Sequence, residues 1–166
     1  MPFTIRRRDM ILGATAAAGL VAAGQPRLAR AATSHTVQML NVHPEEKRLR
    51  QIFLPRIQVI EAGDTVVFEP ADRGHNSASI EDMIPEGQEG WDGAINKEVS
   101  ATLEQPGFYG YKCTPHVSIG MVGLIVVRGE GMMDNLEAAQ GVRQRGKAKA
   151  VWEEIWEEVA AMDLSA

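Results

Sequence analysis

The chain has 166 residues and a formal net charge of −5 at pH 7. Without residues 1–31, whose removal is predicted below, 135 residues remain, with 12 Lys and Arg against 21 Asp and Glu and a net charge of −9. This acidity argues against nucleic acid or an anionic membrane surface as a partner. The remaining length fits one domain of ordinary size.

Residues 1–31 have the features of an export signal peptide that is cleaved from the mature protein. Three arginines at positions 6–8 precede a small, apolar run at 10–23. Ala29-Arg30-Ala31 then fits an A-x-A cleavage site, so we expect the mature chain to begin at Ala32.

The segment RRDMI at 7–11 also fits a twin-arginine signal, which carries folded proteins across the bacterial inner membrane. The apolar run is shorter than the roughly 20 residues that span a bilayer, which argues against a membrane anchor. We therefore expect the mature protein in the periplasm, as a monomer without a membrane segment.

From His35 onward the pattern is one of short strands separated by turns. Residues 35–41 alternate apolar and polar side chains, which is typical of a strand with one buried face. Residues 42–50 are polar and charged, which predicts a surface loop in which His43 is solvated.

A second extended segment is predicted at 52–60, where Pro55 holds the first half at a sheet edge or a bend. Ala62-Gly63-Asp64 then forms a turn. This turn predicts a hairpin between the second segment and a strand at 65–69.

His75 lies in the loop after that strand and is the best-placed histidine of this region for a metal ligand. A solvated loop histidine is the ordinary alternative. His35 begins a strand and His43 lies in the charged loop, so neither is as well placed. We expect Asn76 to hydrogen-bond to the loop that contains the single cysteine, Cys113, and so to fix the positions of the metal-ligating side chains.

Residues 81–96 are rich in Gly, Pro and acids without periodicity, which predicts a long loop with one helical turn. Residues 97–103 return to strand alternation, and a Pro-Gly turn follows at 105–107. Tyr109 lies where sandwiches have a tyrosine corner, although an ordinary core aromatic is the alternative. Some seven short strands predict a mainly β, antiparallel Greek-key β-sandwich.

The single cysteine lies in the central stretch GFYGYKCTPHVSIGMVGLIVV, residues 107–127. Cys113, His116 and Met121 form the pattern C-x2-H-x4-M on a loop between two predicted strands. A thiolate, an imidazole and a thioether suit copper, and a blue-copper centre needs a second imidazole, for which His75 is the candidate. An unpaired thiol in an oxidising compartment also favours a metal at Cys113.

Two helices are predicted after the last strand. Asp134 and Glu137 fit the capping box of a short helix, and a longer helix is predicted at 147–162. The longer helix could bind a partner through its apolar stripe, but docking on the sandwich keeps this stripe from solvent. We therefore divide the mature chain into a β-sandwich at 32–130 and a helical extension at 131–166 packed on it. The stripe consists of Trp152, Ile155, Trp156 and Val159.

The mature chain resembles the pseudoazurins, a family of cupredoxins from bacterial periplasms. The resemblance implies a cupredoxin-like fold and one type 1 copper ion held by His75, Cys113, His116 and axial Met121. It also implies a one-electron carrier and not an enzyme, with periplasmic redox partners such as copper nitrite reductase and c-type cytochromes. The segments that carry it are VQMLN (37–41), AGDTVVF (62–68), DRGHN (72–76), DMIPEG (82–87), PGFYGYKCTPH (106–116), GMVGLIVV (120–127) and NLEAAQG (135–141).

Residues beside the expected ligands predict where a partner docks. Arg73 and Lys112 place positive charge next to two of these ligands. Members of the family ring the copper with lysines, whereas here Ala94 stands at one such position and the loop at 42–50 is longer than usual. These departures affect the partner and not the metal. We expect His116 to present its ring edge at the surface.

Other residues are expected to support the site. Thr114 and Pro115 flank the ligands and are expected, with Asn76, to hold them in place. Met83, Ile84 and Pro85 are expected to form an apolar collar around the exposed histidine edge. As isolated residues they could equally be ordinary loop anchors.

The ligand types leave three other functions to weigh. A nitrite reductase would need a second copper bound by several histidines, and only His35 and His43 remain for it. A copper carrier or chaperone is the main alternative, because the same ligands suit Cu(I), although it needs an exchangeable site. An interaction module with an incidental cysteine predicts no metal.

Overall fold

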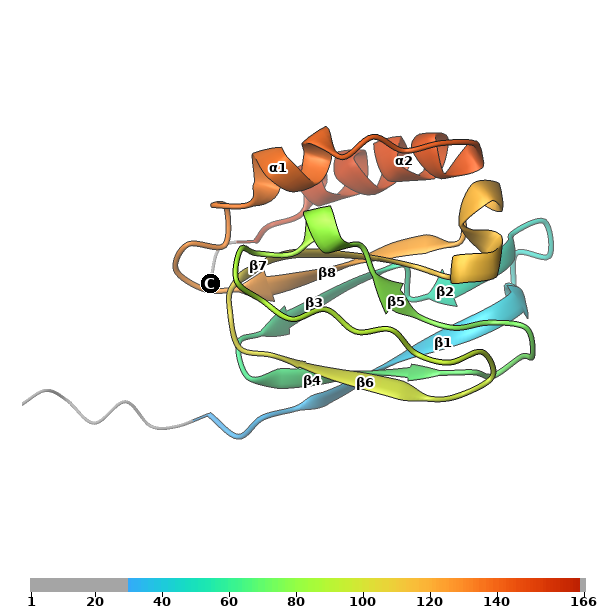
Figure 1. Ribbon diagram of the computed structural model, residues 1–166, viewed down its shortest axis with the longest axis horizontal. Helices are drawn as coiled ribbons and strands as arrows, with labels where there is room; N and C mark the ends of the chain where they lie inside the picture. The colour runs from blue at the N-terminus through green and yellow to red at the C-terminus, as the bar shows by residue number, and fades with distance from the viewer. Residues whose placement is uncertain (1–29, 165–166) are drawn as a thin grey trace, which may run out of the picture. The chain divides into compact units, whose positions relative to one another are not determined.

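Two four-stranded sheets form a sandwich in the computed structural model, which describes residues 30–164. The strand order is β2-β1-β4-β6 in the first sheet and β3-β8-β7-β5 in the second. Helices α1 and α2 cover the outer face of the second sheet, and the 3-10 helix η2 lies at one end (Figure 1). The mainly β sandwich with two C-terminal helices is therefore as predicted. The elements are β1 (Ser34–Val42), β2 (Arg50–Leu54), β3 (Ile57–Glu61), β4 (Asp64–Glu69), β5 (Ala78–Ser79), η1 (Glu81–Met83), β6 (Val99–Leu103), β7 (Gly107–Lys112), η2 (Thr114–Ile119), β8 (Val122–Arg128), α1 (Leu136–Gly141) and α2 (Lys147–Ala161).

The core between the sheets comes from side chains that alternate along the strands. Val37 and Met39 of β1 point inward, together with Phe53 of β2 and Phe68 of β4. The ring of Tyr111 in β7 meets them edge-on, with its centroid 4.7 Å from that of Phe53 and 4.9 Å from that of Phe68. Burial of each large apolar side chain contributes about 1.5–3 kcal/mol to the stability of the sandwich.

The second sheet is covered on both faces, which explains why β7 and β8 have few polar residues. Phe108 and Leu124 turn away from the other sheet and contact the apolar stripe of α2. In that stripe Trp152 and Ile155 are buried, with 2% and 0% of their surface exposed. The strands on either side of the Cys113 loop, β7 and β8, are thus packed on both faces.

The prediction of an antiparallel sandwich was wrong for two pairs of strands. β1 pairs with β4 in parallel, and β3 pairs with β8 in parallel. The expected hairpin before β4 is also absent, because β3 and β4 belong to different sheets. The segment predicted at 52–60 is broken at Pro55, where the chain leaves the first sheet for the second.

Asp64 holds the turn between β3 and β4 against the start of β1. Its buried carboxylate accepts hydrogen bonds from the N–H groups of Thr33 (2.8 Å) and Glu61 (3.2 Å). It also lies 2.9 Å from Nε2 of His35. These contacts tie together the end of β3, the start of β1 and the start of β4, where the chain crosses between the sheets.

The predicted capping box at Asp134 is not formed. Helix α1 begins at Leu136, and Asn135 at its cap makes no capping bond with its side chain. That side chain instead accepts a hydrogen bond from the Phe108 N–H (2.9 Å) and donates one to the Phe108 carbonyl (2.8 Å). The amide of Asn135 thus joins the helical segment to β7.

Tyr109 makes the hydrogen bond of a tyrosine corner. Its hydroxyl donates to the carbonyl of Gln105, four residues earlier, at 2.8 Å. Burial raises the pKa of Tyr109 to about 12, so the phenol stays protonated and remains a donor at ordinary pH.

Truncation of one buried side chain tests how much α2 stabilises the sandwich. Ile155→Ala should lower the free energy of unfolding by about 2–5 kcal/mol, because Ile155 is fully buried against the second sheet. Glu157→Ala, at an exposed position of the same helix, should change it by less than about 0.5 kcal/mol. Urea unfolding measures both, and equal midpoints for the two variants would contradict the packing role of α2.

Candidate metal centre

Three side chains converge at the end of the sandwich where β7 ends. His75 comes from the loop between β4 and β5, Cys113 follows β7, and His116 lies in η2. Sγ of Cys113 is 3.7 Å from Nδ1 of His75 and 3.5 Å from Nδ1 of His116, and the two Nδ1 atoms are 3.2 Å apart. The three atoms could hold one metal ion, because atoms so spaced can all lie about 2 Å from a single centre.

The donor types and their burial fit copper. One thiolate with two imidazoles is the equatorial set of a blue-copper centre. Cys113 and His75 are fully buried, whereas His116 is partly exposed. A metal at this position would therefore be shielded from water on most sides and reach the surface at one imidazole.

Met121 closes the loop that begins at Cys113. Its N–H donates to the carbonyl of His116 (3.2 Å), and its carbonyl accepts from the N–H of Cys113 (3.0 Å). The side chain is fully buried and lies in the same core cluster as Cys113. The backbone of this loop is thus fixed by its own hydrogen bonds.

Asn76 connects the loop of His75 to the loop of Cys113. Its side-chain carbonyl accepts from the N–H of Thr114 (2.8 Å), and its amide donates to Oγ1 of Thr114 (3.0 Å) and to the carbonyl of Gly93 (2.9 Å). The sequence predicted a link between these loops at Asn76. The two bonds to Thr114 form this link, and the third bond ties Asn76 to the segment of Gly93.

Asn41 is a supporting residue that the sequence did not reveal. Its Oδ1 lies 3.0 Å from Nε2 of His75, so Nε2 donates and Nδ1 presents its lone pair toward Cys113. Nε2 of Gln51 donates to the same oxygen at 3.3 Å, and the Asn41 N–H donates to the carboxylate of Asp72 at 2.7 Å. Asn41 closes a predicted strand, and nothing local connects it with a histidine 34 residues away.

Burial sets the protonation states of the buried pair. It lowers the pKa of His75, the neighbouring His116 acts in the same direction, and Asp72 opposes both. Burial also raises the pKa of the Cys113 thiol, against hydrogen bonds from the backbone at Asn76 and His116. The imidazole is therefore neutral and ready to bind a metal, whereas the thiol must release a proton to do so.

Of the residues expected to dock a partner, the two cations lie at the surface. Arg73 is exposed and Lys112 partly so. A methyl group built on Gly74 would lie 4.0 Å from Cε1 of His116, so the Arg73 loop passes beside that ring. Thr114 and Pro115 are also exposed.

The apolar collar expected at residues 83–85 is not formed as predicted. Met83 is 1% exposed and belongs to the cluster beneath α1 and α2, where the amide of Gln144 donates to its sulfur at 3.3 Å. Pro85 is buried as well, and Ile84 is half-buried against the core between the sheets. Contacts between η1 and α1 hold residues 83–85 beneath the helices.

Comparison with known proteins agrees with this fold and site. Residues 40–128 match the model of copper binding proteins of the plastocyanin/azurin family. A pseudoazurin of Paracoccus pantotrophus is 39% identical over 136 residues, covering 82% of this chain and 88% of that relative. One of Methylorubrum extorquens is 38% identical over 128 residues, covering 77% and 83%.

Solved structures give the same result. A pseudoazurin structure from Sinorhizobium meliloti has a TM-score of 0.70 and 42% identity, covering 76% of this chain and 96% of its own. One from Methylobacterium extorquens has a TM-score of 0.69 and 32% identity, covering 76% and 98%. Fold and site thus define a cupredoxin, a copper protein that transfers electrons and is not an enzyme. Within that class, the chain belongs to the pseudoazurins.

Replacement of Asn41 tests its role at His75. Asn41→Leu removes the acceptor for the imidazole N–H and should weaken copper binding about 10–100-fold, since groups that orient ligands have effects of this size. Asn41→Asp keeps an acceptor oxygen and should bind within a few-fold of wild type. Competition with a chelator measures both, and wild-type affinity in Asn41→Leu would show that another contact orients His75.

Proposed function

We propose that this protein is a periplasmic one-electron carrier whose single copper is held by His75, Cys113, His116 and, as a weak axial ligand, Met121. The observation that carries the proposal is the group of three donor atoms, 3.2–3.7 Å from one another, at the end of a rigid sandwich. When bound, copper supplies one-electron chemistry by cycling between Cu(I) and Cu(II).

The protein's own part is to keep the donor atoms in place. The bonds of Asn76 to Thr114, of Asn41 to His75 and within the loop 113–121 fix the positions that both oxidation states must share. A site that moves little between two states exchanges an electron with little reorganisation. Loops fixed by these hydrogen bonds, on a sheet that is packed on both faces, therefore suit electron transfer.

The burial of the site argues against the alternative of a copper carrier. Cys113 and His75 have none of their surface exposed, so an acceptor protein could not reach them without opening a loop. Delivery of Cu(I) needs ligands that a partner can replace one at a time. The hydrogen bonds of Asn76 oppose such opening.

We further propose that the electron passes to partners such as copper nitrite reductase, and that c-type cytochromes are also partners. The partly exposed ring of His116 supports a contact at this end, because it is the proposed ligand nearest to solvent. Thr114 and Pro115, in the same short helix, are exposed as well.

The periplasmic location rests on the predicted export signal at 1–31, most of which lies outside the described residues. A single cysteine that a metal occupies also suits an oxidising compartment. Among residues 30–164, no helix has the length and apolar character needed to cross a membrane.

Removal of the thiol tests the equatorial ligands. Cys113→Ser should abolish the intense visible band of a thiolate bound to Cu(II), because only the sulfur supplies that covalent bond. Visible absorption and copper content of the purified variant measure this. A variant that keeps the band would show that Cys113 is not a ligand.

Met121→Leu tests the axial assignment with a milder change. A weak axial ligand tunes the reduction potential more than it holds the metal, so copper should be retained with a shifted potential. Cyclic voltammetry and metal analysis measure the two quantities. Complete loss of copper would mean that Met121 is not a weak ligand.

A further inference from the structure

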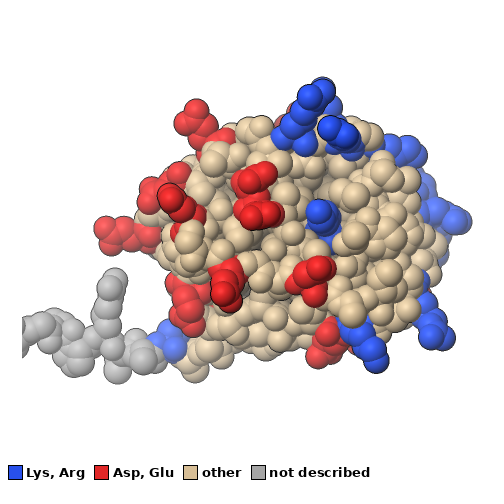
Figure 2. All heavy atoms as spheres, viewed as in Figure 1, with Lys and Arg blue, Asp and Glu red and all other residues tan. Residues whose placement is uncertain are grey.

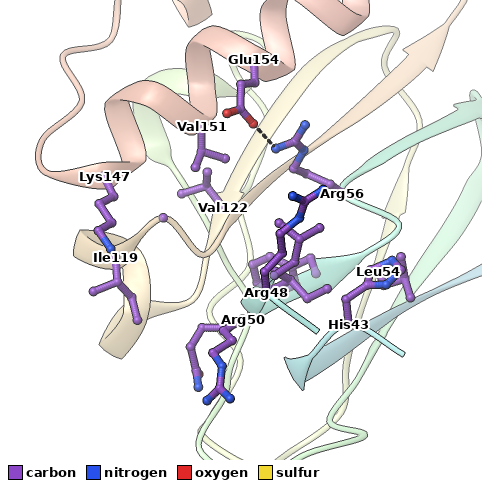
Figure 3. A pocket seen from close by; sticks show the side chains of 15 residues that line it. His43, Arg48, Arg50, Leu54, Arg56, Ile119, Val122, Lys147, Val151 and Glu154 are labelled. Carbon is purple, nitrogen blue, oxygen red and sulfur yellow. Dashed lines mark hydrogen bonds and ion pairs between the residues drawn. The ribbon is translucent and has the colours of Figure 1, made fainter. Parts of the chain in front are cut away.

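A groove of about 700 Å³ lies beside η2, on the side formed by β2 and the loop before it. Figure 3 shows Arg48, Arg50 and Lys147 around it, with Ile119 of η2 at one edge. Phe53, Val122 and Val151 give it an apolar floor. The proposed function makes no use of this groove.

The loop at 43–49 forms one wall and is held by its own hydrogen bonds. The His43 N–H donates to the carbonyl of Leu49 (2.9 Å), and the Leu49 N–H donates to that of Glu46 (2.8 Å). Nδ1 of His43 accepts from the N–H groups of Glu45 (3.1 Å) and Glu46 (3.0 Å). A wall ordered in advance loses little conformational entropy when a partner binds.

The opposite wall is the junction between η2 and the start of α2. A methyl group on Gly146 would lie 2.6 Å from the carbonyl oxygen of Ser118, and one on Gly120 would lie 2.9 Å from Val151. Both glycines also have positive φ angles. This close contact fixes Lys147 near Ile119, which belongs to the same short helix as His116.

The groove is positively charged although the mature chain has a net charge of −9. Its lining holds four cations and one carboxylate, that of Glu154. Arg56 pairs with Glu154 at 2.8 Å and also with Glu158. Arg48 meets Glu46 at 3.7 Å, a weak pair because both side chains are exposed.

The two remaining cations, Arg50 and Lys147, make no ion pair within the described part of the chain. In the view of Figure 2, Lys and Arg gather toward the end of the molecule that carries η2, and Asp and Glu gather toward the other end. The face seen in Figure 2 is therefore polarised along its length. Leu49 and Ile119, exposed by 43% and 48%, add apolar surface to the positive end.

We propose that this groove is the docking surface for an acidic redox partner. A protruding segment of the partner places carboxylates on Arg48, Arg50 and Lys147, and an apolar side chain between Leu49 and Ile119. The inference rests on the proposed electron-carrier function and locates its partner contact on the 43–50 side of His116, not on the side of Arg73 and Lys112.

Two double charge reversals test the location. Arg50→Glu with Lys147→Glu changes the groove, and Arg73→Glu with Lys112→Glu changes the other side by the same net charge. The second-order rate of electron transfer to an acidic copper nitrite reductase, measured by stopped flow at several ionic strengths, compares them. The groove pair should lose roughly tenfold or more at low salt, and the control pair much less. Equal losses, or a larger loss in the control pair, would overturn the proposal.

A second measurement separates this inference from the function on which it rests. Backbone NMR shifts of the Cu(I) protein are followed during titration with a synthetic peptide rich in Glu and Leu. Changes should cluster at Leu49, Arg50, Ile119 and Lys147, and changes near Arg73 or none at all would reject the groove. A protein that binds no copper rejects the proposed function, whereas a copper-loaded carrier with a silent groove rejects only the docking surface.

Discussion

The structure depends on the side chain of Asn76, which holds two distant loops together at the site. Its hydrogen bonds to Thr114 at 2.8 and 3.0 Å join segments 38 residues apart in the chain. The adjacent His75 and Cys113 are thereby brought to 3.7 Å between Nδ1 and Sγ. A buried amide with both its groups bonded is costly to disturb, because any opening leaves polar atoms unpaired.

The sandwich supplies the rigidity that these loops need. β7 and β8 lie between the inter-sheet core and the two helices, so the strands that bracket Cys113 and Met121 are packed on both faces. The helical segment, absent from a simple sandwich, also carries Lys147 to the edge of η2. One extension thus supports the second sheet and shapes the positive groove beside the site.

The sequence predicted what depends on local spacing. C-x2-H-x4-M identified a metal loop, and alternation identified the strands, because both patterns lie within a few residues. It could not predict contacts between segments far apart in the chain: the parallel pairing of β1 with β4, the bond of Asn41 to His75, or the burial of Met83 under the helices. The polar and charged composition of residues 42–50 also gave no sign that this loop would line a groove.

We propose above all that one copper ion is bound by one thiolate, two imidazoles and a distant thioether. X-ray absorption at the copper edge of the metal-loaded protein measures these ligands directly, in both oxidation states. We predict one short sulfur and two nitrogen neighbours whose distances change little on reduction. A copper coordinated by nitrogen and oxygen alone, or one that changes coordination number on reduction, would contradict the account.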